Sequence, residues 1–340
     1  MKFEHLFSPM QVGKVTYRNR IVSAPMAFGL IVQNPDARDF TYRKLESSAR
    51  GGNACVIVGE TDVNFVDAVR IPGFRPFDFA KPEEDMETFQ AVGEYARRIK
   101  RHGAVALAEL VHCGKEKVPF GPNEEAIGPI ETTNLAGVRV HPMNEDDMAR
   151  IARDFAVSAT YMQKAGFDGV LIHGGHGFLF TQFLSPLMNT RTDSYGGSLE
   201  NRARFPLQIL KAVREAVGPD FLVELRIDGT DHQPGGITPE ETGAFVAMAE
   251  PYITSVHVTC GIYEASVKSG TESSMFHPHG LNIDNAAIIK KYTKLPVGAV
   301  GGINSPELCE QAIAEGKIDF AILGRQMLAD PEFANKAKRG

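Results

Sequence analysis

The chain has 340 residues, 43% of them hydrophobic and 23% charged, with a net charge of −6. The absence of any apolar run of about eighteen residues argues against a membrane span, and the mildly acidic balance argues against a nucleic-acid partner. The first residues lack the apolar stretch of a secretory signal, so we expect a cytoplasmic protein. The four cysteines lie far apart and form no Cys-x-x-Cys pair, which favours buried thiols over a zinc site or redox dithiol.

Short β-branched or apolar runs alternate along the chain with longer segments of helical period. Continuous apolar runs of this kind are typical of parallel strands that are covered on both faces. We expect eight strands, at residues 21–24, 54–58, 104–110, 169–173, 221–226, 255–259, 296–300 and 320–324.

Amphipathic segments follow these strands, and several begin at recognisable helix starts. Thr238-Pro239-Glu240-Glu241 is a capping box with proline at the first helical position, and Ser305-Pro306 begins another helix in the same way. Asn144 precedes three acidic residues, which the helix macrodipole favours at an amino end. Helices are expected at residues 85–101, 144–165, 199–217, 239–249, 285–292, 306–315 and 331–338, with a less regular one at 40–50.

Eight strands that each lead into a helix predict an α/β protein, a closed (β/α)8 TIM barrel. An open doubly wound sheet is the alternative, but that fold usually carries a glycine-rich loop after its first strand, where this chain has Ser23-Ala24-Pro25-Met26-Ala27. Because we find no repeat or linker, we expect residues 1–340 to form one domain. The long segments 59–82, 111–143 and 174–198 follow strands, which in a barrel places them on the catalytic face.

Two glycine-bearing turns, Gly301-Gly302 and Gly324-Arg325, follow the last two expected strands. Glycine allows backbone N–H groups to approach a phosphate closely, and Arg325 could add a charge-assisted contact. We therefore expect a phosphate-binding corner, although the same glycines would also suit tight strand-to-helix turns.

Arg226 lies at the end of the fifth expected strand, in Glu224-Leu225-Arg226-Ile227-Asp228. A cation at a barrel mouth is costly unless it meets an anion, and this one would suit the electron-rich pyrimidine side of a reduced flavin. A salt bridge to Glu224 or Asp228 is the alternative. A sugar-phosphate isomerase would share the phosphate corner, so Arg226 is the feature that favours a flavin.

The most specific pattern lies between Asp168 and Phe205, at residues 173–179 (HGGHGFL), 182–186 (QFLSP) and 189–205 (NTRTDSYGGSLENRARF). With these segments the chain resembles the old yellow enzyme family of NADH:flavin oxidoreductases. It is most similar to the barrel domain of the 2,4-dienoyl-CoA reductase and bile-acid-type branch. The likeness runs from residues 6–9 to residues 329–331 and so covers essentially the whole chain.

The resemblance implies FMN at the barrel mouth, with NADH or NADPH as its reductant. In the family, the residues that match His173 and His176 hold the substrate's carbonyl oxygen above the flavin. Two imidazoles beyond a strand end can converge on an oxygen that gains negative charge during hydride transfer; without a third ligand they do not favour a metal site. The positions that match the family's flavin-binding residues are Pro25, Met26, Ala27, Gly59, Glu109, Arg226, Gly301, Gly302, Gly324 and Arg325.

Four features depart from the family pattern. Phe178 replaces the tyrosine that usually donates a proton to the substrate, although it keeps a place in the substrate pocket. Glu109 replaces a glutamine at the flavin's pyrimidine edge, where a carboxylate would repel an anionic reduced flavin unless it is protonated or tied to a cation. Ala27 replaces a threonine or cysteine. Larger relatives continue into an iron–sulfur segment, so such a cluster is expected only if this chain is a fragment.

Together these observations predict a ping-pong ene-reductase that carries hydride from NAD(P)H through FMN to the C=C bond of an enone, steroid-like compound or enoyl thioester. Tyr263, His277, His279 and water are the candidate proton donors. The alternatives are a flavin-binding electron-transfer module of a larger assembly with little turnover of its own, and a barrel isomerase without flavin. The expected partner is a small molecule, and the formation of a homo-oligomer is left open.

Overall fold

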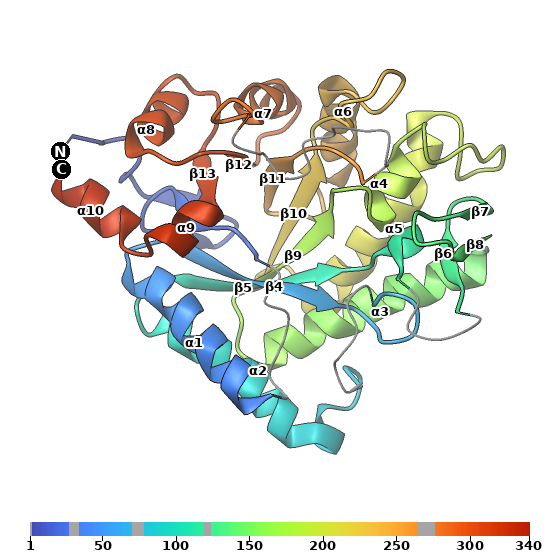
Figure 1. Ribbon diagram of the computed structural model, residues 1–340, viewed down its shortest axis with the longest axis horizontal. Helices are drawn as coiled ribbons and strands as arrows, with labels where there is room; N and C mark the ends of the chain where they lie inside the picture. The colour runs from blue at the N-terminus through green and yellow to red at the C-terminus, as the bar shows by residue number, and fades with distance from the viewer. Residues whose placement is uncertain (1, 27–33, 70–77, 119–123, 264–275) are drawn as a thin grey trace.

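Eight parallel strands close into a barrel in the computed structural model (Figure 1), which describes residues 2–26, 34–69, 78–118, 124–263 and 276–340. All ladders in the ring are parallel. The predicted (β/α)8 barrel and its eight strands are therefore confirmed. In chain order the strands are β3 (Ile21–Ser23), β4 (Cys55–Asp62), β5 (Val105–Val111), β9 (Gly169–Gly174), β10 (Leu222–Asp228), β11 (Ser255–Thr259), β12 (Val297–Val300) and β13 (Phe320–Leu323).

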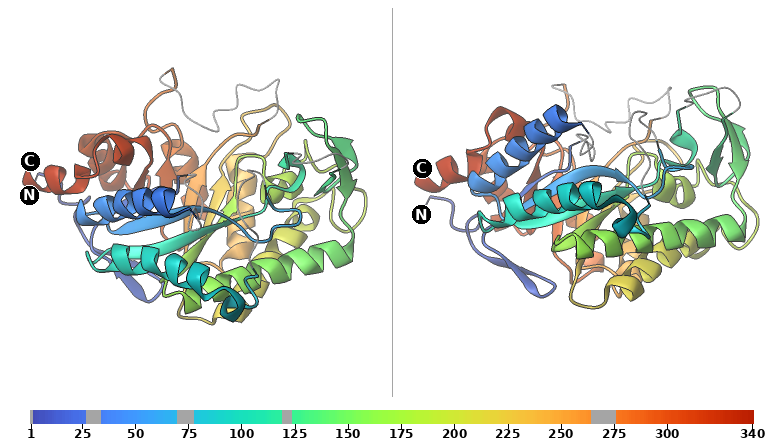
Figure 2. Two further views of the ribbon diagram at one scale, coloured as in Figure 1. Left: turned by 60° about the horizontal axis from the view of Figure 1, so that its bottom comes forward. Right: turned by 90° about the horizontal axis from the view of Figure 1, so that it is seen from below.

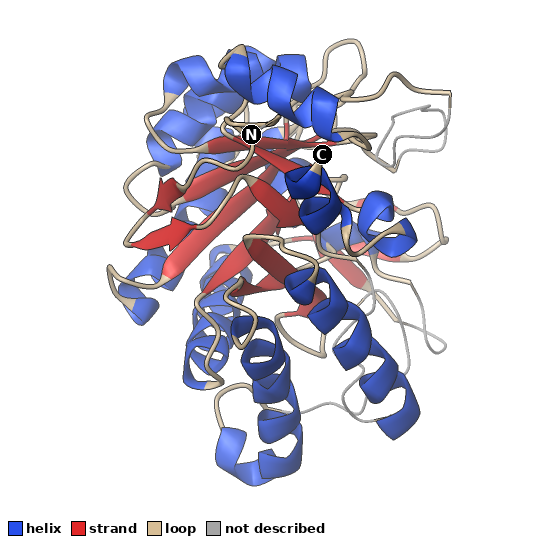
Figure 3. Cartoon of the chain, turned by 90° about the vertical axis from the view of Figure 1, so that its left-hand side faces the viewer, coloured by secondary structure: helices blue, strands red, loops and turns tan. Residues whose placement is uncertain are grey.

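Helices surround the ring on its outside, as Figure 3 shows. The larger apolar core lies between these helices and the outer faces of the strands. On one flank α3 and α5 run side by side (Figures 1 and 2). The helices are α1 (Pro35–Arg50), α2 (Met86–Lys100), α3 (Glu145–Lys164), α4 (Leu179–Leu184), α5 (Leu199–Val217), α6 (Pro239–Ala249), α7 (Ile283–Ile289), α8 (Pro306–Ala314), α9 (Arg325–Ala329) and α10 (Phe333–Arg339).

The predicted helix starts are confirmed. Asn144 and Thr238 each form a complete capping box, and the Ser305 side chain accepts a hydrogen bond from the Leu308 amide. The least regular predicted helix, at 40–50, begins earlier than expected, at Pro35. Asn34 caps it by accepting hydrogen bonds from the amides of Asp36 and Ala37, and this Asn-Pro start signal was overlooked.

A hairpin that the sequence did not predict closes the amino end of the barrel. Its strands, β1 (Met10–Val12) and β2 (Val15–Tyr17), are antiparallel. Met10, Val12 and Tyr17 are buried in a second apolar cluster with residues on the inner faces of the strands. This end of the barrel, which we call the floor, is therefore filled by side chains, and the opposite end is the mouth.

Further short elements lie within segments that we expected to be loops. A small sheet of β6 (Ala126–Gly128), β7 (Thr132–Thr133) and β8 (Arg139–Pro142) precedes α3, and Figure 1 shows it beyond the barrel. Helices α4 and α9 follow β9 and β13 directly. These pieces are too short to produce a clear periodicity, so tertiary contacts decide their conformation.

Candidate functional site

Three neighbouring strands bring Glu109, His173 and Arg226 together at the mouth. In the β9–β10 ladder Arg226 lies directly opposite His173. In the β5–β9 ladder Glu109 lies opposite Leu171, two residues before His173. Alternate residues of a strand face the same side, and Leu171 belongs to the inner cluster, so all three side chains face the barrel interior.

Glu109 is the common partner of this group. Its Oε1 lies 3.0 Å from Nδ1 of His173 and 3.5 Å from a terminal guanidinium nitrogen of Arg226. Burial would raise the pKa of Glu109, but the charges and hydrogen bonds of His173 and then Arg226 outweigh it, so the pKa is lowered. The lowered pKa favours the ionised carboxylate, which contacts His173 and Arg226, and the alternative bridge from Arg226 to Glu224 or Asp228 gives way to this pairing.

His176 is held in an unusual conformation beside this group. Its φ of 61° is in the left-handed region, which non-glycine residues rarely adopt. The His176 amide donates to Oδ2 of Asp228 at 2.7 Å, and its Nε2 lies 2.8 Å from Oγ1 of Thr259. The rings of His173 and His176 are 5.1 Å apart, and Arg226 approaches Nε2 of His176 at 3.4 Å. The two predicted histidines are therefore adjacent.

Two buried nitrogen atoms of this group have no hydrogen-bond partner within the described part of the chain: Nε2 of His173 and Nε of Arg226. Buried donors and acceptors are nearly always paired, so such atoms need an explanation. A polar ligand that reached the mouth would satisfy them. This is the property expected of a binding site.

Asp228, which the sequence analysis did not propose as a site residue, anchors the loop that carries His176. Its Oδ2 also accepts a hydrogen bond from Oγ1 of Thr181 at 2.8 Å. Burial raises the pKa of Asp228 to about 8, although the His176 amide and the Thr181 hydroxyl oppose the rise. The sequence could have indicated Asp228 as a site residue, since it lies two residues after Arg226 and therefore faces the same side of the strand.

Phe178 packs against His173, with ring centroids 5.3 Å apart, in a small apolar cluster with Val111 and Cys113. Tyr263 also packs against Phe178, at a centroid distance of 5.8 Å. His277 instead lies near His232, whose pKa is lowered by burial and then by His277. The roles of both candidate donors, Tyr263 and His277, stay predictions.

Pro25, Gly59 and Glu109 lie close together at the ends of β3, β4 and β5. A Cβ atom at Gly59 would approach Cβ of Pro25 to 2.5 Å and Oε2 of Glu109 to 2.7 Å, so only glycine fits there. Met26 follows Pro25 and is half-buried, whereas Ala27 lies outside the described residues.

The two glycine turns lie on neighbouring strands, since β12 pairs with β13. Gly301 and Gly302 have φ values of 126° and 63°, which other residues rarely adopt. The Gly301 carbonyl accepts from the amides of Gly280 and Leu281 at 3.0 and 3.1 Å. Gly324 ends β13, and the exposed Arg325 begins α9. The structure thus brings the predicted phosphate residues together at one side of the mouth.

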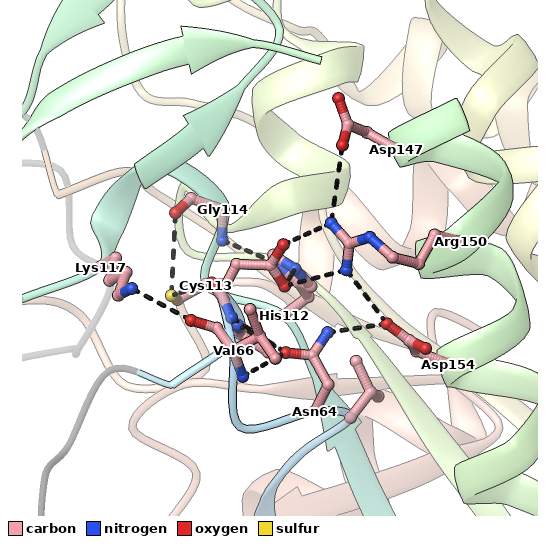
Figure 4. Close-up of polar contacts among 12 residues, drawn as sticks. Asn64, Val66, His112, Cys113, Gly114, Lys117, Asp147, Arg150 and Asp154 are labelled. Atoms are coloured by element: carbon pink, nitrogen blue, oxygen red, sulfur yellow. Dashed lines mark hydrogen bonds and ion pairs between the residues drawn. The ribbon is translucent and has the colours of Figure 1, made fainter. Parts of the chain in front are cut away.

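A polar network among the segments after β4 and β5 and helix α3, shown in Figure 4, was missed by the sequence analysis. Asp67, in the segment after β4, contacts Nε2 of His112 at 3.1 Å and Arg150 of α3 at 2.5 Å. Burial would raise the pKa of Asp67, but His112 and Arg150 lower it. The His112 carbonyl accepts from the Leu179 amide at 3.2 Å. The network therefore joins the segments after β4 and β5 to the start of α4.

Over the described ranges, no group of three His, Cys, Asp or Glu side chains could hold a metal ion. No helix in those ranges is long and apolar enough to cross a bilayer. The four cysteines are buried, as expected.

Comparison with known proteins adds to this geometry. The model of the NADH:flavin oxidoreductase / NADH oxidase family matches residues 5–340. The chain is 34% identical to an NADH oxidase of Thermoanaerobacter brockii, over 99% of this chain and 51% of that protein. It is 31% identical to a cinnamate reductase of Clostridium sporogenes, over 98% of this chain and 53% of that protein.

Among solved structures, a 2-naphthoyl-CoA reductase in complex with 2-naphthoyl-CoA is similar to this chain, with a TM-score of 0.87 and 25% identity. The match covers 99% of this chain and 52% of that one. The chain thus spans about half the length of these relatives.

Proposed function

Because the chain belongs to the NADH:flavin oxidoreductase / NADH oxidase family, we propose that it is an FMN-dependent enzyme that uses NADH or NADPH to reduce the C=C bond of an α,β-unsaturated carbonyl compound. The observation that carries the proposal is the adjacency of the His173–His176 pair to Arg226 and Glu109 at the mouth. Cinnamate and 2-naphthoyl-CoA, which name two of the relatives, are conjugated carbonyl compounds, and this supports the substrate class.

The residues present fit FMN. The unpartnered Nε of Arg226 is a buried donor that can serve the polar edge of the ring, and the absence of a side chain at Gly59 leaves room beside Pro25 and Glu109. Gly301, Gly302, Gly324 and Arg325 would hold the phosphate. When bound, the flavin supplies hydride chemistry that no side chain provides.

The substrate side of the proposal depends on the two histidines. His173 and His176 would hold the carbonyl oxygen, which gains negative charge as the double bond is reduced, and donors aimed at such an oxygen stabilise the transition state. Asp228 and Thr259 hold His176 in place by their hydrogen bonds. Phe178 and Val111 would exclude water from the apolar part of the substrate.

The test is anaerobic mixing of the FMN-loaded protein with NADH or NADPH, followed by an enone or enoyl thioester. We expect the flavin's visible absorption to bleach with at least one nicotinamide and to return with the conjugated compound. The corresponding saturated ketone is the control and should leave the flavin reduced. A protein that takes up no FMN, or whose reduced flavin ignores every conjugated carbonyl, contradicts the proposal.

A second candidate is a flavin-binding electron-transfer module within a larger assembly. Two observations favour it: Phe178 offers no proton, and the chain spans about half of several relatives. This candidate predicts tight FMN binding but no bleaching by free NADH or NADPH, so the same experiment separates the two.

A further inference from the structure

The pair formed by Glu109 and His173 is a carboxylate–imidazole contact between neighbouring strands. The 3.0 Å separation joins Oε1 to Nδ1. The two residues are only 5% and 4% exposed, so water does not screen the contact. Nδ1 therefore faces the carboxylate, and Nε2 is the ring nitrogen left for the barrel mouth.

The chemistry of the pair determines which nitrogen carries the proton. Glu109 is ionised, since its pKa is lowered, and an ionised carboxylate can only accept hydrogen bonds. Nδ1 must therefore carry a proton. In the neutral ring Nε2 then carries a lone pair and accepts a hydrogen bond, whereas in the cationic ring it carries a proton and donates one. This nitrogen is buried and has no partner among the described residues. His173 can therefore exchange a proton with a ligand only through Nε2.

The surroundings leave His173 as the group best placed for this exchange. Phe178, which packs against the His173 ring, has no exchangeable proton, and the ring of Tyr263 packs against Phe178. His176 already uses its Nε2 for Thr259. Within the described residues, the titratable and charged groups beside His173 or its direct partners include Glu109, His176, Arg226, Asp228 and Tyr263.

We propose that Glu109 and His173 form an acid–base dyad that supplies the proton of the reaction, with His173 as the catalytic acid and Glu109 as its positioning residue. The inference rests on the proposed function. As hydride adds to the β-carbon, the C=C electron pair shifts toward the carbonyl carbon and the C=O pair moves onto oxygen. That oxygen takes the Nε2 proton, which gives an enol and a neutral His173.

The remaining steps are proton transfers to and from solvent water. The enol becomes the saturated carbonyl compound by taking a proton from water at its α-carbon and losing the one on oxygen, and His173 regains its proton from solvent. Hydride plus one net proton are thereby added, with the reduced flavin as reductant. In the reverse direction the Nε2 lone pair acts as the base.

The stereochemistry of the product tests this route in the unaltered protein. With 2-methylcyclohex-2-enone and brief turnover in D2O, an enol that is released into solvent gives both configurations at the methyl-bearing carbon. A donor fixed in the pocket gives one. Product of a single configuration would overturn the dyad, whereas failure to reoxidise the reduced flavin at all would overturn the proposed function instead.

The tautomer of His173 is a second, activity-independent readout. In protein labelled with 15N-histidine, we expect the neutral form of the His173 ring to carry its proton on Nδ1 and none on Nε2, with H173Q supplying the assignment. Glu109→Gln should remove this bias because an amide can also donate to Nδ1. The matched control is Glu224→Gln, which alters the other buried Glu–His contact of the barrel, with His257. An unchanged His173 tautomer in Glu109→Gln would contradict the dyad.

The rates of the two half-reactions provide a third test of the dyad. Glu109→Gln should slow reoxidation by the enone by about 10²-fold or more relative to reduction by NAD(P)H, since general acid catalysis contributes roughly 10²–10⁴-fold. An unchanged ratio of the two half-reaction rates in Glu109→Gln would reject Glu109 as the positioning residue.

Discussion

Within the described residues, two buried Glu–His pairs lie in the barrel, one at the floor and one at the mouth. At the floor, Glu224 contacts Nε2 of His257 and accepts a hydrogen bond from the Tyr17 hydroxyl at 2.6 Å. At the mouth, Glu109 contacts His173 and Arg226. Glu224 and Arg226 are two residues apart on β10 and face the same interior.

The difference between the pairs lies in what covers them. The floor pair is 0–1% exposed, and its third partner, Tyr17, comes from the β1–β2 hairpin. The mouth pair is 4–5% exposed, and its third partner is a cation, Arg226, with a buried, unpartnered Nε within the described chain. The same pair of residue types therefore serves stability at one end of the strands, and at the other end it would serve ligand chemistry.

The largest expected effect is at the mouth. Replacing both His173 and His176 by alanine should lower kcat/KM for an enone by about 10²–10³-fold or more, the usual cost of removing a donor to a developing oxyanion. Binding of a phenol, followed by its charge-transfer absorption with the flavin, should weaken in parallel. Unchanged phenol binding would contradict the role of the pair.

The next effect is at the floor. Glu224→Gln should lower the free energy of unfolding by roughly 1–3 kcal/mol, because it disturbs the buried hydrogen bonds to Tyr17 and His257. Chemical denaturation measures this loss. The exposed Glu307→Gln, on α8, is a matched control and should change stability little. A Glu224→Gln protein as stable as the parent would show that the floor pair contributes nothing.

The smallest effect concerns the pH dependence of stability at Asp228. Its pKa is about 8 in the folded protein against an ordinary 3.8, so over that range the folded chain binds a proton that the unfolded chain releases. This contribution to stability is complete below the ordinary pKa and is lost as pH rises through about 8. It changes by at most about 1.4 kcal/mol per pH unit.

Asp228→Asn removes this titration. The variant's stability relative to the parent should therefore increase as pH rises from 6 to 8, and thermal unfolding of both proteins at several pH values measures it. A constant difference between the two proteins would show that Asp228 does not hold a proton in the folded state.

The sequence predicted the elements that depend on local signals. The eight strands, the caps at Asn144 and Thr238 and the glycine turns follow from periodicity and start signals. The family pattern also identified His173, His176, Arg226 and Glu109. Their roles in binding stay predictions, but the structure brings them together.

What could not be predicted depends on contacts between distant segments. Arg226 and Glu109 are 117 positions apart in the sequence, and Asp67 and Arg150, which form an ion pair, are 83 positions apart. Nothing in the neighbourhood of Asp67 distinguishes it from a solvated carboxylate until the fold places His112 and Arg150 beside it. The hairpin at the floor was likewise overlooked, because three-residue strands produce no readable alternation.

The β1–β2 hairpin affects the route by which small molecules can reach the interior of the barrel. Gly13 at its tip is so close to Leu222 and Thr254 that an added Cβ would lie 3.2 Å from each side chain, and Tyr17 of the same hairpin is buried. Because the described side chains at that end are closely packed, we expect small molecules to enter and leave the interior at the mouth. If electron donor and acceptor both use this opening, an excess of either should inhibit the other competitively, and initial-rate plots should bend downward at high concentrations.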